Sequence, residues 1–185
     1  MPETKTDPAK KNNGIRFRQA FDIYLPYILH IGSIEPSKES HKLFDYFIRF
    51  KEEHPIPLRL VLAGKAAMDL PEHRDIIHLG MIDKQMKFDA IGGSEFLIDP
   101  FRHESLPMAV PESWSLDKAV LVNGESNIMV EQCIRTNGGL WYKNYKTFEL
   151  NTLFLLENAY RFTGMKAFVE TNENPDNIHK RVLIK

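Results

Sequence analysis

The chain has 185 residues, is 43% apolar and carries 24 Lys and Arg against 25 Asp and Glu, a formal net charge of -1. This composition predicts one soluble globular domain with tails, and the balanced charge argues against general nucleic-acid binding. The single Cys133 excludes an intrachain disulfide, and neither a signal-like start nor an apolar membrane-spanning stretch is present, so we expect a cytoplasmic protein.

The first twenty residues differ in composition from the rest of the chain. Lys, Asn, Asp, Pro and Gly dominate residues 1–20, and no apolar period is visible before Phe21. Because such a segment buries little apolar surface, we expect residues 1–20 to form a flexible lead-in. Folding is then expected to begin near Ile23, with one domain over residues 21–170 and a tail over residues 171–185.

Short apolar runs alternate with longer amphipathic segments in the expected domain. The runs predict strands over residues 27–31, 59–63, 76–79, 96–98, 119–122 and 139–141. Helices are predicted over residues 41–53, 83–91, 104–114, 128–134 and 147–160. Strands that are nearly all apolar imply a sheet covered on both faces, joined by right-handed crossovers. We therefore expect an α/β fold, a Rossmann-like doubly wound parallel sheet of about six strands with helices on both faces.

In such a fold, ligands bind at the carboxyl ends of the strands, so the residues that follow each strand are candidate contacts. Gly32 follows the first strand and permits close backbone approach, and Lys38 at the start of the next helix is suited to pair with a phosphate. Gly64 and Lys65 follow the second strand without the other residues of a Walker motif. Taken alone, each feature is better explained by a turn and a solvated lysine.

Glu104 and Glu112 lie eight positions apart after the fourth predicted strand. A strand that ends at Pro100 and leads through a short loop into a helix would place Glu104 at the helix N-terminus and Glu112 about two turns later on the same side. A helix start attracts anions and carboxylates accept hydrogen bonds from hydroxyls, so the pattern suggests a nucleotide sugar. The alternative, two solvated glutamates on one helix face, explains the spacing alone better.

Metal and nucleophile chemistry find little support in the sequence. His73 and His78 match neither a helical His pair nor a Cys/His cluster, so we expect no metal site. No Gly-x-Ser-x-Gly turn is present, and Cys133 lies in a predicted helix rather than at a strand end. The sequence therefore carries no signature of a metalloenzyme or of a serine or cysteine hydrolase.

Four segments that follow the predicted strands form an ordered set. They read Gly32-Ser-Ile-Glu-Pro-Ser-Lys38, Leu62-Ala-Gly64, Leu79-Gly80, and Pro100-Phe-Arg-His-Glu104 with Glu112. Over residues 27–170 this set resembles the C-terminal, donor-binding domain of the family 4 retaining glycosyltransferases, which have a two-domain GT-B fold. Members of that family carry Gly-Arg-x-x-x-x-Lys, Val-x-Gly, Leu-Gly, and Pro-Ser-x-x-Glu with a second Glu eight positions on, in the same order.

The resemblance implies metal-independent transfer of a sugar from a UDP- or GDP-type donor to an unknown acceptor, without a cofactor. It implies that Lys38 contacts the donor diphosphate, Glu104 the sugar hydroxyls or the reacting face, and Glu112 the ribose hydroxyls. The backbone N–H groups of Ser105 and Leu106 would bind the phosphates. The implied site residues are Gly32, Lys38, Gly64, Glu104, Ser105, Leu106 and Glu112.

The chain departs from the family pattern at several positions. Ser33 replaces the arginine that would share the diphosphate charge, a loss that typically costs a few kcal/mol of transition-state stabilisation. Pro111 cannot continue helix hydrogen bonding, so we expect it to displace Glu112 or to kink the helix. Asp117 stands where members have a glycine before the fifth strand. An enzyme of this family also needs an N-terminal domain that holds the acceptor, so we expect the isolated chain to be inactive without such a partner domain.

Two function classes stay open. The first is the nucleotide-sugar-binding half of a glycosyltransferase, and the second is a degenerate, non-catalytic Rossmann-like interaction domain of the same descent. A flavodoxin-like or receiver-like binding module would share the sheet but not the spacing of the two glutamates.

Overall fold

The computed structural model describes residues 11–103 and 105–158 of the chain. It contains a six-stranded sheet in the order β3-β2-β1-β4-β5-β6, in which every neighbouring pair is parallel. The strands are β1 (Tyr27–Ile31), β2 (Arg59–Ala63), β3 (Ile76–His78), β4 (Leu97–Asp99), β5 (Val120–Asn123) and β6 (Gly139–Tyr142). The predicted doubly wound parallel sheet is confirmed, and its strand order is the one found in Rossmann folds.

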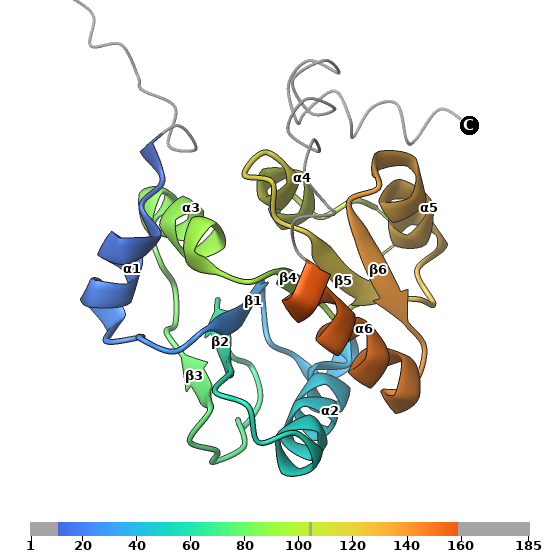
Figure 1. Ribbon diagram of the computed structural model, residues 1–185, viewed down its shortest axis with the longest axis horizontal. Helices are drawn as coiled ribbons and strands as arrows, with labels where there is room; N and C mark the ends of the chain where they lie inside the picture. Colours follow the sequence, from blue (N-terminus) through green and yellow to red (C-terminus); the bar gives the residue numbers. More distant parts are fainter. Residues whose placement is uncertain (1–10, 104, 159–185) are drawn as a thin grey trace, which may run out of the picture.

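Helices cover both faces of the sheet (Figure 1). On one face lie α2 (Ser40–Glu53) and α6 (Tyr145–Asn158), and on the other lie α1 (Gly14–Phe21), α3 (Lys84–Gly93), α4 (Ala109–Trp114) and α5 (Asn127–Thr136). A short 3-10 helix, η2 (Pro36–Lys38), precedes α2. In the part of the chain that the structure describes, no helix combines the length and the apolar character needed to cross a membrane.

The amphipathic pattern of α2 fixes this helix on the sheet. Leu43, Phe44, Phe47 and Phe50 recur at helical spacing, and each is at most 3% exposed. Burying an aromatic or leucine side chain contributes about 1.5–3 kcal/mol, so this apolar face dominates the docking of α2. The ring of Phe50 also meets the ring of Phe148 in α6, with centres 6.2 Å apart, so the two helices of this face pack on each other.

The helix α1 occupies part of the segment predicted to be a flexible lead-in. The side chain of Asn13 caps it by accepting two backbone N–H groups, and the buried Phe17 is 0% exposed. Gly14 approaches α3 so closely that a Cβ at this position would come within 2.6 Å of the Gly93 Cα. The prediction is therefore wrong for residues 14–20, because a long-range contact stabilises a helix too short to show an apolar period. Residues 1–10 and the predicted tail lie outside the described residues, and the domain boundaries stay predictions.

The segment between β4 and β5 also differs from the prediction. A helix was expected over residues 104–114, but α4 begins only at Ala109. Leu106 precedes Pro107, and the residue before a proline is disfavoured in the helical conformation, so the helix cannot run through this position without strain. The other predicted helices and strands match the structure to within two residues at each end.

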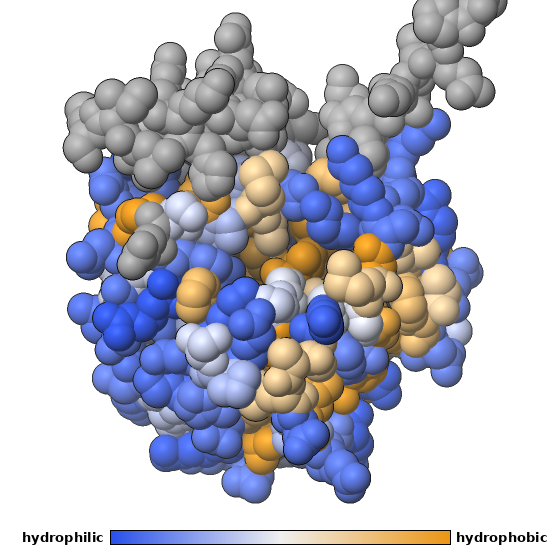
Figure 2. Space-filling view, turned by 180° about the vertical axis from the view of Figure 1, so that it is seen from behind, coloured by the Kyte–Doolittle hydropathy of each residue, from blue (hydrophilic) through white to orange (hydrophobic). Residues whose placement is uncertain are grey.

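Exposed apolar side chains occur at several places on the surface of the described residues. Figure 2 shows a largely hydrophilic face on which apolar residues gather mostly toward the side of α1 and α3. Exposed large apolar side chains in the described residues are spread over several elements and comprise Ile15, Tyr24, Met81, Met108, Ile134, Leu150 and Phe154. Exposed apolar side chains that are scattered in this way do not by themselves mark a binding site.

Candidate functional site

β1 and β4 are neighbours in the centre of the sheet, but the chain leaves them in opposite directions. β1 leads to β2 on one side, whereas β4 leads to β5 on the other. Ligands of open parallel sheets bind beyond the carboxyl ends of the strands at such a topological switch point. The loops that follow β1 and β4, residues 32–38, 100–103 and 105–108, are called the switch-point rim below.

Gly32 and Gly64 lie side by side at the ends of β1 and β2. Both have positive φ angles, 152° and 150°, and a Cβ on Gly64 would come within 1.9 Å of the Gly32 carbonyl oxygen. The Gly32 N–H donates to the carbonyl of Ala63 at 3.0 Å, and the His78 Nε2 donates to the carbonyl of Gly64 at 2.8 Å. The two glycines therefore allow the two loop backbones to touch, a structural role that the sequence did not reveal.

Lys38 connects the two halves of the switch-point rim. Its ammonium donates to the Ser33 hydroxyl, lies 3.4 Å from a Glu35 carboxylate oxygen, and lies 5.4 Å from the centre of the Phe101 ring. Hydrogen bonding from Ser33, followed by the charge of Lys38, lowers the pKa of Glu35 despite the opposing effect of desolvation. Ser33 therefore orients Lys38, whereas the arginine of the glycosyltransferases that the sequence resembles would supply a second positive charge.

A polar cluster that sequence reasoning missed lies beneath this rim. His30 is 5% exposed, and its Nδ1 lies 3.1 Å from the carbonyl oxygen of Ile98. Because a carbonyl only accepts, Nδ1 carries the proton and Nε2 is an acceptor, which is buried and has no hydrogen-bond partner among the described residues. Burial lowers the pKa of His30, so the neutral ring is favoured. The only signal in the sequence was a histidine inside an otherwise apolar strand.

Asp99 and His103 extend this cluster on the β4 side. Asp99 is 4% exposed, and its carboxylate accepts the backbone N–H of Phe101 at 2.9 Å. The Nε2 of His103 lies 3.0 Å from each Asp99 carboxylate oxygen. These hydrogen bonds join Asp99 to the first residues of the β4–α4 loop. They thereby hold Phe101 in place under Lys38.

The predicted phosphate contacts Ser105 and Leu106 lie on the switch-point rim, Ser105 exposed and Leu106 at 2% exposure. Since α4 begins at Ala109, their backbone N–H groups do not belong to its first turn. The expectation that a helix starts at position 104 is therefore wrong. Glu104 itself lies outside the described residues, so its role stays a prediction.

Glu112 has a partner within the chain. Its Oε1 lies 2.5 Å from the ammonium of Lys87 in α3, and the two side chains are 10% and 24% exposed. Its Oε2 is buried and has no hydrogen-bond partner in residues 11–103 and 105–158. The ion pair joins α4 to α3, so any ligand hydroxyl that reaches Glu112 would share the carboxylate with Lys87.

Pro111 does not interrupt α4, and a displacement of Glu112 stays a prediction. It is the third residue of α4, where a backbone N–H has no partner inside the helix in any case. The N–H of Glu112 already donates to the carbonyl of Met108 at 3.2 Å, so helical bonding begins directly after the proline. Asp117 adopts a φ of 53°, a left-handed conformation that aspartate tolerates and glycine adopts without strain.

Among the described residues, Glu53, His54 and Glu149 offer ligand atoms that lie within 4.8 Å of one another. Each already has a protein partner. Glu53 accepts hydrogen bonds from Arg49 at 2.9 Å and Tyr145 at 2.5 Å, and the His54 Nε2 lies 2.9 Å from Glu149. The cluster is explained by polar contacts between the end of α2 and α6, while the absence of a functional metal site stays a prediction.

Comparisons with solved structures relate the fold to glycosyltransferases, although no family model and no curated protein matches the sequence. A glycosyltransferase from Rickettsia africae ESF-5 has a TM-score of 0.71 at 15% identity over 97% of this chain and 54% of that one. Anabaena Alr3699/HepE in complex with UDP-glucose has a TM-score of 0.67 at 13% identity over 97% of this chain and 52% of that one.

A third comparison concerns an isolated domain. The C-terminal domain of LpcC, a group 1 family glycosyl transferase from Francisella tularensis, has a TM-score of 0.64 at 16% identity over 91% of this chain and 97% of that one. The fold is one half of a GT-B glycosyltransferase fold. This GT-B half-domain spans about half of the Rickettsia and Anabaena chains. Its switch-point rim places Gly32, Lys38, Ser105 and Leu106 at the edge where open parallel sheets bind ligands.

Proposed function

We propose that this chain is the nucleotide-sugar-binding half of a retaining glycosyltransferase of the family 4 type. It would take a sugar from a UDP- or GDP-type donor, and an N-terminal domain would hold the acceptor. The observation that carries the proposal is the position of Lys38 at the switch-point rim of a GT-B half-domain. The order of the sequence motifs and the likeness to a structure in complex with UDP-glucose support it.

Lys38 is the group proposed to bind the donor diphosphate. Its pair with Glu35 is 3.4 Å long between side chains that are 30% and 34% exposed, and ion pairs at such solvent-accessible positions contribute little to stability. A diphosphate carries more charge than one carboxylate and can therefore displace Glu35. As the bond between the sugar and the diphosphate breaks, negative charge grows on the leaving group, and the Lys38 ammonium would stabilise it without a metal ion.

The remaining proposed contacts lie on the segment after β4. Exposed Ser105 and neighbouring Leu106 would direct backbone N–H groups to the phosphates, and Glu104 would face the sugar. The Oε2 of Glu112 has no partner in the part of the chain that the structure describes and would accept a ribose hydroxyl, with Lys87 holding the other oxygen. Because Ser33 supplies no positive charge, we expect slow or absent transfer by the chain on its own.

A second candidate function is a non-catalytic interaction domain that no longer binds nucleotide sugars. One observation favours it: Lys38 and Glu112, the two charged residues on which donor binding rests, both have partners within the chain. In this alternative, the same contacts only stabilise the rim and join α3 to α4. The two functions differ in whether a donor binds the isolated chain.

Calorimetry and thermal shift with UDP-glucose, a GDP-sugar and an ADP-sugar test the proposal. We expect saturable heat with one nucleotide class and a higher melting temperature, since a ligand at one hundred times its Kd stabilises the folded state by about 2.7 kcal/mol. No heat and no shift with all three at millimolar concentration would leave only the interaction domain.

A further inference from the structure

Asn123 is a buried polar side chain at the carboxyl edge of the sheet, and the proposed donor contacts do not include it. It is the last residue of β5 and is only 4% exposed. Val122 pairs with Asp99 in the neighbouring strand β4, so Asn123 lies beside the first residue of the β4–α4 loop. The Asn123 side chain reaches this loop and also the residue directly after Lys38, so it meets both halves of the proposed donor site.

The Asn123 amide is held at three points. Its Nδ2 donates to the carbonyl oxygen of Pro100 at 2.8 Å and to a carboxylate oxygen of Glu39 at 3.1 Å. Its Oδ1 accepts the backbone N–H of Glu125 at 2.9 Å. A flipped amide would turn its oxygen toward a carbonyl and a carboxylate, which only accept, so these partners define the orientation of the side chain.

Each acceptor of the Asn123 Nδ2 is adjacent in sequence to one member of the contact between Lys38 and Phe101. Pro100 precedes Phe101, and Glu39 follows Lys38. The Lys38 ammonium lies 5.4 Å from the centre of the Phe101 ring. One amide therefore connects the backbone next to the ring with the side chain next to the cation, although the two segments are distant in the chain.

The backbone conformation of Glu39 depends on contacts of this kind. Glu39 has a φ of 54° and lies between η2 and α2. The other non-glycine residues with positive φ in the described part of the chain are all Asp or Asn, which tolerate the left-handed conformation better than glutamate does. A residue in this conformation persists where its surroundings hold it. The bond from Asn123 and a 3.2 Å contact with Lys42 hold the Glu39 carboxylate.

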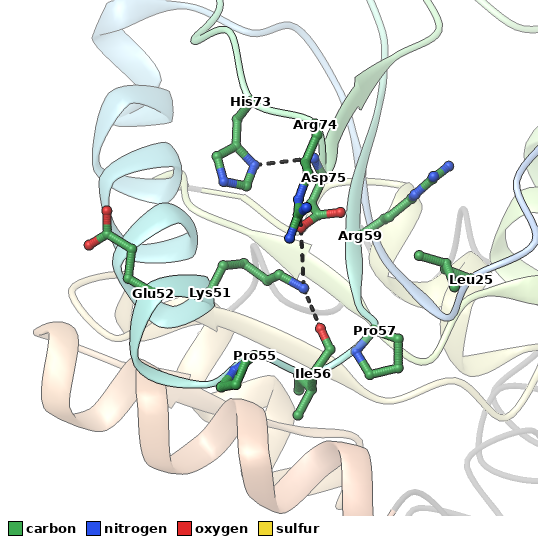
Figure 3. A pocket seen from close by; sticks show the side chains of 10 residues that line it. All are labelled: Leu25, Lys51, Glu52, Pro55, Ile56, Pro57, Arg59, His73, Arg74 and Asp75. Carbon is green, nitrogen blue, oxygen red and sulfur yellow. Dashed lines mark hydrogen bonds and ion pairs between the residues drawn. The ribbon is translucent and has the colours of Figure 1, made fainter.

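A buried polar contact at the opposite edge of the sheet provides a contrast. The Lys51 ammonium lies 3.3 Å from Asp75 in the wall of a cavity of about 580 Å³, at the amino ends of β2 and β3 (Figure 3). Figure 3 shows the guanidinium of Arg59 turned away from His73 and Arg74, so these three groups do not converge on one ligand. The contact of Lys51 holds the fold together, whereas that of Asn123 also reaches both sides of a candidate ligand contact.

We propose that Asn123 is a positioning residue of the donor site: its amide fixes Phe101 relative to Lys38, so that the ammonium is held where the donor diphosphate would bind. The inference rests on the proposed function, because Asn123 acts only through Lys38. Without the amide, the Pro100 carbonyl and the Glu39 carboxylate would each lose a hydrogen bond, and the two loops would shift independently. The ammonium would then be ordered only when the donor binds, which lowers the affinity.

An NMR signal of Lys38 tests the positioning without any donor. Its ε-methylene protons, assigned by their absence in Lys38→Met, are expected upfield because of the ring current of Phe101, and Phe101→Leu gives the value without the ring. Asn123→Asp keeps the size of the side chain but removes both N–H donors. We expect this substitution to move the signal toward the value of Phe101→Leu. An unchanged signal in Asn123→Asp would overturn the positioning role.

A matched substitution separates positioning from a general loss of stability. Asn151 in α6 donates its amide to the carbonyl of Trp141 at 2.7 Å, outside the switch-point rim. Asn151→Asp should therefore leave the Lys38 signal unchanged, and equal shifts in Asn151→Asp and Asn123→Asp would contradict the proposal.

A second substitution tests the link through Glu39. In the double variant of Asn123→Asp and Glu39→Gln, the introduced amide can donate to the introduced carboxylate, so the Lys38 signal should return part of the way. A double variant no closer to the parent chain than Asn123→Asp would contradict this link. Glu39→Ala keeps the bond from Asn123 to Pro100 and decides the case if Asn123→Asp does not fold. It should also move the signal toward the value without the ring, and an unchanged signal would overturn the proposal.

Calorimetry with UDP-glucose and a GDP-sugar measures the consequence for the donor. Asn123→Asp is expected to weaken binding about three- to tenfold, because part of the free energy of the lost hydrogen bonds is taken from the bound state. Asn151→Asp should bind as the parent chain does. Donor binding with equal affinity in the parent chain and in Asn123→Asp would overturn the inference and leave the proposed function intact. No binding by the parent chain would overturn the proposed function and the inference with it.

Discussion

The ammonium of Lys38 lies 5.4 Å from the centre of the Phe101 ring, so a cation from the loop after β1 lies over an aromatic ring from the loop after β4. Cation–π contacts at such partly exposed sites contribute about 0.5–1 kcal/mol. Together with the Ser33 hydroxyl, the ring positions the positive charge at the switch point before any ligand arrives. The proposed donor site is thereby partly preorganised.

Removal of the Lys38 charge should abolish most donor affinity. Lys38→Met keeps much of the side-chain volume and is expected to weaken nucleotide-sugar binding by about 10- to 100-fold in calorimetry, because a charge-assisted contact is lost. Phe101→Leu should have a smaller effect, about two- to fivefold, through looser positioning of Lys38. Lys146→Met, at a side chain that is 73% exposed on α6, is the control. Equal affinities of Lys38→Met and the parent chain would contradict the role of Lys38.

Docking of α1 can be tested through its buried phenylalanine. Phe17 is 0% exposed, so Phe17→Ala should lower the free energy of unfolding by about 3–5 kcal/mol in urea titrations. Ile15→Ala on the same helix should change it by less than about 0.5 kcal/mol, since Ile15 is 68% exposed. If both substitutions had the same small effect, α1 would not be part of the folded domain.

The contact between the first two loops predicts different costs for two glycine substitutions. Gly64→Ala would place a Cβ 1.9 Å from the Gly32 carbonyl oxygen at a φ of 150°, so we expect a loss of about 3 kcal/mol or more. Gly80→Ala meets no atom within 4 Å, and its φ of 69° alone should cost about 1–2 kcal/mol. Thermal or urea unfolding measures both, and equal losses would argue against the close approach.

The buried His30 predicts a stability that falls in mild acid. Burial lowers the pKa of His30, with Asp99, His103 and Lys38 as the titratable groups around it, so the folded protein binds fewer protons than the unfolded chain. This contribution is fully present above the unfolded pKa of about 6.5 and is lost as the pH falls toward the folded pKa, by at most about 1.4 kcal/mol per pH unit.

The variant His30→Phe should flatten this part of the pH dependence between about pH 7 and about pH 5.5. Urea unfolding at both pH values measures the slope. His41→Phe, at an exposed position on α2, should leave the slope unchanged. An unaltered slope in His30→Phe would assign the acid sensitivity to other groups.

The architecture could be predicted from the sequence because it depends on local patterns. Continuous apolar runs such as the one at residues 119–122, which forms most of β5, indicated strands buried on both faces, and the helical spacing of Phe44, Phe47 and Phe50 indicated a helix on the sheet. Gly32 and Lys38 could be assigned to the carboxyl end of β1 from the sequence, because both lie in the short segment that follows this strand.

The partners of the site residues were decided only by the tertiary structure. The bond between His30 and Ile98 joins residues 68 positions apart, and the pair of Lys87 and Glu112 joins residues 25 positions apart. Such contacts arise when β1 and β4 become neighbours and α3 packs on α4, which no local period encodes. The sequence thus determined which groups stand at the ends of the strands. The packing of distant segments determined which of these groups are paired. It also determined which polar atoms, such as the Nε of Arg59, are buried without a partner among the described residues.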